Sequence, residues 1–449
     1  MRIAPWLALF AGGAAAAATG GAVAQTTLAQ APIRVVADLA GLSRRAGIDY
    51  LKASNAGAYE HFGETVALSA DGDTLAVGAT GEDSAAAGTG GDQADNSMDN
   101  AGAAYVFARE GTAWSQQAYI KASNTGGTEE GDQFGYDVAL NAGGTTLAVS
   151  AIAEDSAATG IGGAQDDDSA PDSGAVYVFV RDGGGWSQQA YVKPRPIPGD
   201  TFVESVLFGF AIGLDARGDT LAASAYNEDT NRGRIYVFTR DATQWSEQAR
   251  FRGANAEQGD ALASAIAVSA DGDTVVGGAF DEDSVLLGVA PADAGADDYL
   301  TNLAVGAAYV FVRDGTEWSQ QAFIKPTNTQ LNQHFGWAVA LSRDGTTVAV
   351  GAHFEDGASS GINGDQRDAA APDAGAVYVY RRSGSVWTPI AYVKASNSSA
   401  RAEFGTAVAL NADGTVLAVG APREAGGGAG IAPEPTGAAA PESGAVYAY

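Results

Sequence analysis

The stretch from Phe62 to Asn124 contains the pattern on which the fold depends. It opens with Phe62-Gly63 and runs through VALSADGDTLAVGA at 66–79. After an acidic loop it ends with AAYVF at 103–107 and WSQQAYIKASN at 114–124. Similar sequences recur several times later in the chain. Because a recurring unit usually decides the architecture of a chain, the repeats are considered before any single residue.

Six units can be counted from the way each one begins. An aromatic-glycine pair opens five of them, and the fourth begins with Leu262-Ala263 instead. The five pairs are Phe62-Gly63, Phe134-Gly135, Phe208-Gly209, Phe335-Gly336 and Phe404-Gly405. The units therefore cover approximately 62–124, 134–193, 208–255, 262–328, 335–397 and 404–449.

Each unit predicts four β-strands in sequence. Val66-Ala67-Leu68 and Thr74 to Val77 flank an Asp-Gly turn, which is a hairpin signal. A third strand follows at Tyr105 to Phe107, and a fourth runs from Trp114 to near Lys121. Repeated four-stranded units are typical of a β-propeller. We therefore predict an all-β propeller with six antiparallel blades, seven being the alternative, and a parallel β-solenoid as the competing fold.

The two ends of the repeat array complement each other. The last unit stops after its third strand, at Val446 to Tyr449. Asp49 to Asn55 reads DYLKASN, which matches AYIKASN at 118–124, the end of the first unit. We predict that residues 48–55 supply the fourth strand of the last blade, which would close the ring and leave no open sheet edge.

The first residues predict export. Arg2 precedes an apolar run from Trp6 to Ala18, and Ala22-Val23-Ala24 forms a small-residue cleavage pattern. A membrane anchor is the alternative, but the run is short and interrupted by glycines. We predict a signal peptide at 1–24, a lead-in at 25–47 without repeat character, and one domain at 48–449. The mature protein is then secreted, at the cell surface or periplasmic.

Composition limits the partners and the chemistry. The chain has 25 Lys+Arg against 54 Asp+Glu, a formal charge of −29, and it has no cysteine. A surface of this charge repels phosphate backbones and anionic lipid, so we expect no nucleic-acid partner and no membrane insertion. Without cysteine, neither disulfides nor a thiolate metal site is available.

The Phe-Gly opening, the Val-Gly-Ala that ends the second strand and the later Gly-x-Val-Tyr-Val-Phe resemble the FG-GAP repeat of the integrin alpha-subunit propeller and its bacterial relatives. The resemblance covers Ile48 to Tyr449 and implies a propeller with an adhesive, ligand-binding role. Many repeats of that family hold calcium in a D-x-[DN]-x-D-G-x-x-D loop between the first two strands. That loop is absent here, because short turns such as Ser69 to Asp73 carry too few oxygen ligands. We interpret them as plain hairpin turns.

Acidic loops between the second and third strands are the candidates for cation binding. Their carboxylates are hard oxygen ligands of the kind that calcium prefers. The alternative is an acidic loop that is simply solvated. The candidate calcium ligands are Asp92, Asp95, Asp99, Asp166, Asp167, Asp168, Asp365 and Asp368.

A Glu-Asp pair follows the second strand in five units. Paired carboxylates can act as acid and base in glycoside hydrolysis. A catalytic pair is needed only once, however, whereas a turn or a contact between blades is needed in every unit, so we predict a structural role. The pairs are Glu82-Asp83, Glu154-Asp155, Glu228-Asp229, Glu282-Asp283 and Glu355-Asp356.

The histidines and the recurring tryptophans also favour structural roles. His61 and His334 occupy the same repeat position in different blades, which gives little support for a shared zinc site. The tryptophans could form a stacking platform for sugars, but their period favours packing between blades. No nucleophile elbow or phosphate-binding loop is present. A binding surface is expected where the units differ, as in the long loops at 284–304 and 194–206.

These observations predict an exported, non-enzymatic, monomeric propeller that binds an extracellular protein or carbohydrate, as in cell-surface adhesion. One alternative is a calcium-binding structural protein of a surface or matrix. Another is a glycan-acting enzyme, or an enzyme-associated domain, that uses the acidic loops.

Overall fold

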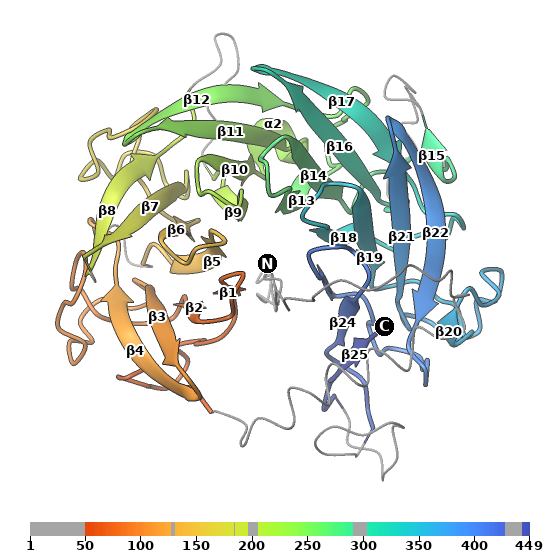
Figure 1. The fold of residues 1–449 in the computed structure, drawn as a ribbon, viewed down its shortest axis with the longest axis horizontal. Helices are drawn as coiled ribbons and strands as arrows, with labels where there is room; N and C mark the ends of the chain where they lie inside the picture. The colour runs from red at the N-terminus through yellow and green to blue at the C-terminus, as the bar shows by residue number, and fades with distance from the viewer. Residues whose placement is uncertain (1–49, 127–130, 184, 196–204, 291–302, 427–441) are drawn as a thin grey trace, which may run out of the picture.

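The structure, a computed structural model, describes residues 50–126, 131–183, 185–195, 205–290, 303–426 and 442–449. Six antiparallel sheets are arranged around a ring in this part of the chain (Figure 1). Besides the strands, the described residues contain one four-residue element, α2 (Glu228–Asn231), a turn in which Asp229, Thr230 and Asn231 have positive φ. The predicted all-β propeller with six blades is therefore confirmed.

The sheets follow one another along the chain, and each is called a blade here. The first three blades contain β1 (Val66–Leu68), β2 (Thr74–Ala79), β3 (Ala103–Glu110) and β4 (Ala113–Ile120); β5 (Phe134–Leu140), β6 (Thr146–Ala151), β7 (Ala175–Asp182) and β8 (Gly185–Val192); and β9 (Phe208–Leu214), β10 (Thr220–Ala225), β11 (Arg234–Asp241) and β12 (Gln244–Phe251). The last three contain β13 (Leu262–Val268), β14 (Thr274–Ala279), β15 (Val289–Ala290), β16 (Ala307–Asp314) and β17 (Glu317–Ile324); β18 (Phe335–Leu341), β19 (Thr347–Ala352), β20 (Gly361–Ile362), β21 (Ala376–Ser383) and β22 (Val386–Lys394); and β23 (Ala407–Leu410), β24 (Leu417–Ala421) and β25 (Ala445–Ala448).

The turn between the first two strands of each blade is a plain hairpin turn, as predicted. In blade one, Gly72 has φ +73° and donates its N–H to the Ser69 carbonyl at 2.9 Å. The Ser69 hydroxyl donates to Asp71 at 2.6 Å and accepts the Thr74 N–H at 2.9 Å. Glycine tolerates the left-handed conformation that such a turn requires.

These turns also connect neighbouring blades through the backbone. The Ala70 N–H donates to the carbonyl of Ala142 in the next turn at 3.0 Å, and the pattern continues from blade to blade. The further bonds run from Ala142 to Ala216, Ala216 to Ala270, Ala270 to Arg343 and Arg343 to Ala412.

The glycines of the repeat mark a close approach between blades. A Cβ at Gly78 of β2 would lie 2.1 Å from the carbonyl oxygen of Gly135, the glycine of the next Phe-Gly pair. A Cβ at Gly351 would lie equally close to the carbonyl oxygen of Gly405. At these positions only glycine permits the two backbones to pass at this distance, whereas blades two and three carry Ser150 and Ser224 in place of the second-strand glycine.

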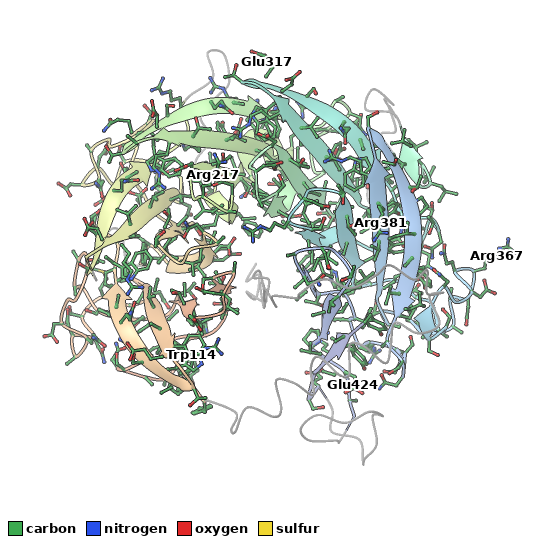
Figure 2. All side chains as sticks on the ribbon, viewed as in Figure 1. Trp114, Arg217, Glu317, Arg367, Arg381 and Glu424 are labelled. Carbon is green, nitrogen blue, oxygen red and sulfur yellow. The ribbon has the colours of Figure 1, made fainter. Side chains whose placement is uncertain are left out.

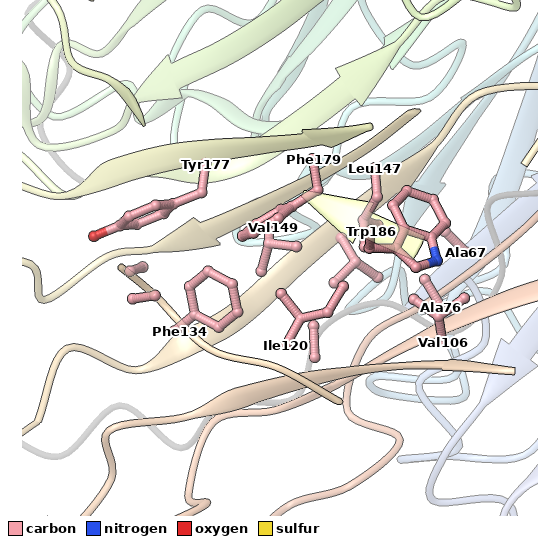
Figure 3. Close-up of a cluster of buried hydrophobic side chains, with 14 of the residues drawn as sticks. Ala67, Ala76, Val106, Ile120, Phe134, Leu147, Val149, Tyr177, Phe179 and Trp186 are labelled. Carbon is pink, nitrogen blue, oxygen red and sulfur yellow. The ribbon is translucent and has the colours of Figure 1, made fainter. Parts of the chain in front are cut away.

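The phenylalanine of each Phe-Gly pair anchors the core between blades. Phe134 is fully buried and lies edge-on to Tyr177, with ring centroids 5.3 Å apart. Ile120 of blade one and Trp186 of blade two belong to the same cluster (Figure 3). Burying such a side chain stabilises the fold by about 1.5–3 kcal/mol, so each repeat contributes its own anchor.

Closure of the ring by an amino-terminal strand is not seen in the described residues and stays a prediction. Blade six contains only β23, β24 and β25, and residues 50–55 form no strand. Among the described turns, no backbone bond joins Ala412 to Ala70, and the ring is open between blades six and one (Figure 1). The predicted signal peptide and lead-in lie outside the described residues.

Within the described ranges, no helix is long and apolar enough to cross a membrane.

Candidate functional site

The acidic loops use many of their carboxylates to hold their own backbone. Asp95 accepts the N–H groups of Ala85 and Ser97 at 3.0 and 3.1 Å. Asp92, Asp167, Asp365 and Asp368 each accept the N–H of the residue two positions later, at 2.9 to 3.2 Å. Such turns are a common local use of aspartate.

The candidate calcium ligands belong to three separate loops. Asp92, Asp95 and Asp99 lie in blade one; Asp166, Asp167 and Asp168 lie in blade two; Asp365 and Asp368 lie in blade five. Among the described residues, no three Asp, Glu or His side chains are grouped so that they could hold a metal ion. Calcium binding by these loops stays a prediction.

The recurring Glu-Asp pairs have the structural role that the sequence predicted. The Glu82 carboxylate is completely buried and lies 2.5 Å from Nζ of Lys121, which is also completely buried. The same carboxylate accepts the Tyr119 hydroxyl at 2.7 Å and the amide of Asn55, the residue that enters blade one, at 2.8 Å. We call this arrangement of glutamate, cation and incoming asparagine the clasp. It joins one blade to the segment that leads into it.

The clasp recurs with small changes. Glu154–Lys193 and Glu355–Lys394 pair at 2.6 and 2.7 Å, and Glu282 pairs with Lys325. Asn124, Asn255 and Asn328 donate to these three glutamates from the preceding blade. In blade three the cation is Arg252, which pairs with Glu228 at 2.9 Å. The glutamate of each pair therefore makes contacts that stabilise the fold.

The tryptophans of the fourth strands pack between blades, which confirms the structural interpretation. Trp245 Nε1 donates to Gln189 of the preceding blade at 2.9 Å, and Trp387 donates to Gln321 in the same way. The Arg240 guanidinium lies 5.4 Å from the Trp245 ring centroid. These rings are not available as a platform for a ligand.

A different set of aromatic side chains lies on or next to the first and second strands, and the first strands line the inside of the ring (Figure 1). Its members lie immediately before or after the Phe-Gly position, at the start of a first strand, or after the Gly-Ala position, at the end of a second strand. The six units carry different residues at these two places. We call the set the aromatic belt; it consists of Tyr136, Phe210, Tyr226, Phe280, His334, Trp337, His353 and Phe354.

The belt is continuous over four blades. Tyr136 of blade two contacts Phe210 of blade three with centroids 5.4 Å apart, and Phe210 stacks on Tyr226 at 4.5 Å. Tyr226 is followed by Phe280 of blade four at 6.4 Å, and Phe280 by Trp337 of blade five at 5.0 Å. The five side chains in this series are all partly exposed: Tyr136, Phe210, Tyr226, Phe280 and Trp337.

Histidines form the end of the belt in blade five. The rings of His334 and His353 lie 5.3 Å apart, and His353 lies 4.4 Å from Trp337. Burial lowers the pKa of His334 to about 4 and that of His353 well below its usual value. Both imidazoles are therefore neutral at pH 7, and each offers one N–H donor and one acceptor nitrogen.

Charged groups lie beside the belt. Asp281 Oδ1 is 3.9 Å from His334 Nε2, and burial raises the pKa of Asp281 to about 6. Glu64 of blade one accepts the Thr80 hydroxyl at 2.8 Å, and burial raises its pKa as well. In blade six, Arg423 and Glu403 form an ion pair at 2.8 Å.

One carboxyl group lies under the belt and ties three blades together. Asp137, the residue after Tyr136, accepts the Thr65 hydroxyl of blade one at 3.1 Å and the Ile212 N–H of blade three at 2.9 Å. Burial raises the pKa of Asp137 to about 7. This side chain positions the inner strands that carry Tyr136 and Phe210.

The recurring motifs of the sequence do not predict the belt. The divergent loops 284–304 and 194–206, where a binding surface is expected, lie largely outside the described residues. The available signal is the variation at two positions of the repeat. Immediately after Phe-Gly, the six units carry Glu, Tyr, Phe, Ser, Trp and Thr in order. Immediately after Gly-Ala, they carry Thr, Ile, Tyr, Phe, His and Pro. His61 and His334 lie in different blades, whereas the ring of His353 contacts that of His334.

Comparison with known proteins gives matches to a repeat family over two stretches of the chain and remote structural likenesses. The family model described as FG-GAP repeat matches residues 114–179 and 318–380. No curated protein sequence matches the chain. Among solved structures, the periplasmic gluconolactonase PpgL of Pseudomonas aeruginosa is similar at 14% identity over 71% of either chain, with a TM-score of 0.40. A likeness this remote carries no argument about activity.

Proposed function

Because this chain is a six-bladed β-propeller in which two stretches match the FG-GAP repeat, we propose that it is an exported, non-enzymatic binding protein whose aromatic belt receives a carbohydrate. The observation that carries the proposal is the unbroken series of ring contacts from Tyr136 to His353, built only from positions where the repeats differ. A merely structural set would be expected to repeat in every blade, as the clasps and the tryptophans do.

The chemistry of the belt suits a sugar. One face of a pyranose is lined with C–H groups, which pack against the negative faces of aromatic rings. Its hydroxyl groups both donate and accept hydrogen bonds, and neutral imidazoles and carboxylates complement them. Trp337 and Phe280 supply the faces, while His334, Asp281 and Glu64 supply the polar partners.

The support beneath the belt favours a rigid binding surface. Each belt residue lies at the end of the inner hairpin where the glycine contacts occur, and the turn bonds that join the blades lie at the opposite end of the same hairpin. Binding sites that are rigid before binding lose less conformational entropy when the ligand arrives. The proposal therefore places recognition at the centre of the ring instead of in long surface loops.

The test is binding of the purified protein to dextran, mannan and chitin oligosaccharides by affinity electrophoresis and calorimetry. Trp337→Ala should weaken binding of the responding sugar at least tenfold, because it removes the largest stacking face. Tyr59→Ala is the matched control, since Tyr59 is 88% exposed and outside the belt, and it should bind as the unaltered protein does. Retention of affinity in Trp337→Ala, or absence of binding to every sugar, would reject a carbohydrate site at the belt.

A glycan-acting enzyme is the second candidate. It is favoured by the raised pKa of Asp281 and of Glu64, because an acid with a raised pKa can hold a proton for transfer. Release of reducing ends from the same polysaccharides, abolished by Asp281→Asn while binding is kept, would establish hydrolysis. Binding without any release of reducing ends supports the non-enzymatic proposal.

A further inference from the structure

The glutamate of the clasp in blade six has no cation beside it. Glu424 is 5% exposed and accepts the Asn397 amide at 2.8 Å, as its counterparts accept theirs. Among the described residues no lysine or arginine pairs with Glu424, whereas the corresponding glutamate of every other blade has a basic partner. A buried carboxylate without a counterion is unfavourable, so a partner is missing.

The cation in the other blades arrives with the fourth strand. Lys121, Lys193, Lys325 and Lys394 each lie at the end of that strand or next to it. Blade six has no fourth strand in the described structure, so the outer edge of β25 has no strand partner among the described residues. Glu424 lies in this blade, beside the open side of the ring (Figures 1 and 2). Val446 of β25 is 62% exposed, while Val377, its counterpart in blade five, is completely buried.

The chain has five lysines, and all of them occupy this one repeat position. Four complete a clasp, and the fifth is Lys52, which is exposed. Lys52 follows Tyr50 and Leu51 just as Lys121 follows Tyr119 and Ile120. Tyr50 is 84% exposed, although Tyr119 is 2% exposed and bound to the clasp glutamate.

The next residues of this segment are already in their repeat position. Asn55 donates to Glu82 at 2.8 Å and accepts the Tyr105 hydroxyl at 2.5 Å. Asn124 makes the same two contacts, with Glu154 and Tyr177, at the entrance to blade two. The segment therefore leads into blade one as a fourth strand of blade six would, and only Tyr50 to Lys52 lack their partners.

We propose that Tyr50 to Lys52 dock on the outer edge of β25 as the fourth strand of blade six. Lys52 then pairs with Glu424 and completes the sixth clasp, and the Tyr50 hydroxyl donates to the same carboxylate. Leu51 lies opposite Val446, because the five other blades place the corresponding residues opposite each other, as Val377 and Val393 are. The occupant is the chain's own segment, and a second copy is the competing occupant.

The absence of cysteine makes this register testable by cross-linking. In the full-length mature protein, Leu51→Cys with Val446→Cys should form a disulfide within one chain under mild oxidation, detected by mass and by mobility on non-reducing gels. Val377→Cys with Val393→Cys is the matched control for the register. A disulfide between two chains would overturn the proposal in favour of a second copy. No disulfide in the test pair, with one in the control pair, would also overturn it.

A charge exchange tests the ion pair independently of cross-linking. Lys52→Met should lower the Tm by several degrees, while Arg367→Met, at an exposed position, should not change it. Lys52→Glu and Glu424→Lys should each lower the Tm, and the two together should recover most of the loss. An unchanged Tm in Lys52→Met, or no recovery in the double variant, would reject the pairing of Lys52 with Glu424.

Discussion

Asp132 shows how strongly one buried carboxyl group can make stability depend on pH. It is 2% exposed, and neither of its oxygen atoms has a hydrogen-bond partner among the described residues. Burial, reinforced by the charges of Glu154 and Asp155, raises its pKa to about 8. The unfolded chain has an ordinary aspartate pKa of about 4. Between these two values the folded state binds a proton that the unfolded state has released, so the destabilisation grows as the pH rises.

Asp132→Asn should therefore raise the Tm at pH 8 and have little effect near pH 4, because an amide cannot ionise. Thermal unfolding across this range measures the difference. Asp71→Asn is the control with the opposite sign, since hydrogen bonds from Ser69 and the backbone lower the pKa of Asp71. That change should lower stability at neutral pH and lose its effect in acid. A gain for Asp132→Asn that does not vary with pH would contradict the assignment.

At the scale of the element, each of the first five blades has a clasp that joins its fourth strand to the loop after the second strand. Lys394 at the end of β22 and Glu355 are both completely buried and lie 2.7 Å apart. Tyr392 and Asn328 also donate to Glu355, at 2.9 and 3.1 Å. The carboxylate is tolerable only while its cation and donors are present.

Lys394→Met should reduce the free energy of unfolding by about 3–5 kcal/mol, because it leaves the Glu355 charge buried and unpaired. Adding Glu355→Gln should recover most of this loss, since the amide oxygen still accepts hydrogen bonds but carries no charge. Urea unfolding of the single and double variants measures both the loss and the recovery of the free energy of unfolding. A single variant that loses less than about 1 kcal/mol, or a double variant without recovery, would contradict a clasp that acts as a unit.

The sequence predicts the strands well because each one is specified locally. β1 coincides with the predicted Val66 to Leu68, and the Asp-Gly turn after it has the predicted form. The recurrence of the Glu-Asp pair indicated a structural role, but its lysine partner lies 39 residues away from Glu82, beyond any local pattern. The belt was missed for a different reason. Averaging over repeats hides positions such as Tyr136 and Trp337, where the units differ.

At the scale of the whole molecule, the interfaces between blades use contacts of different physical kinds. Backbone bonds join the hairpin turns, glycines such as Gly351 and Gly405 allow close approach, and asparagines such as Asn328 reach the next clasp. These contacts run from blade one to blade six in chain order. The belt lies on this framework, so its geometry depends on the relative placement of the blades, and the open junction is where that placement is least constrained.

The net charge of −29 gives a prediction for the whole molecule. Repulsion among surface carboxylates weakens as salt shortens the Debye length, from about 30 Å at 0.01 M to about 8 Å at 0.15 M. We expect NaCl to raise the Tm over this range. A comparison of CaCl2 with MgCl2 at equal ionic strength separates this screening effect from the calcium binding that the acidic loops predict.

Differential scanning calorimetry in the three salts measures both effects. A calcium site in the acidic loops would raise the free energy of unfolding further with calcium alone, because only the folded state would bind the ion. The gain would be about 2.7 kcal/mol at a calcium concentration one hundred times Kd. Asp167→Asn would then remove that excess and leave the response to NaCl intact. Such a result would establish the loops as calcium ligands, and it would require their aspartates to leave the turn bonds that they make with their own backbone.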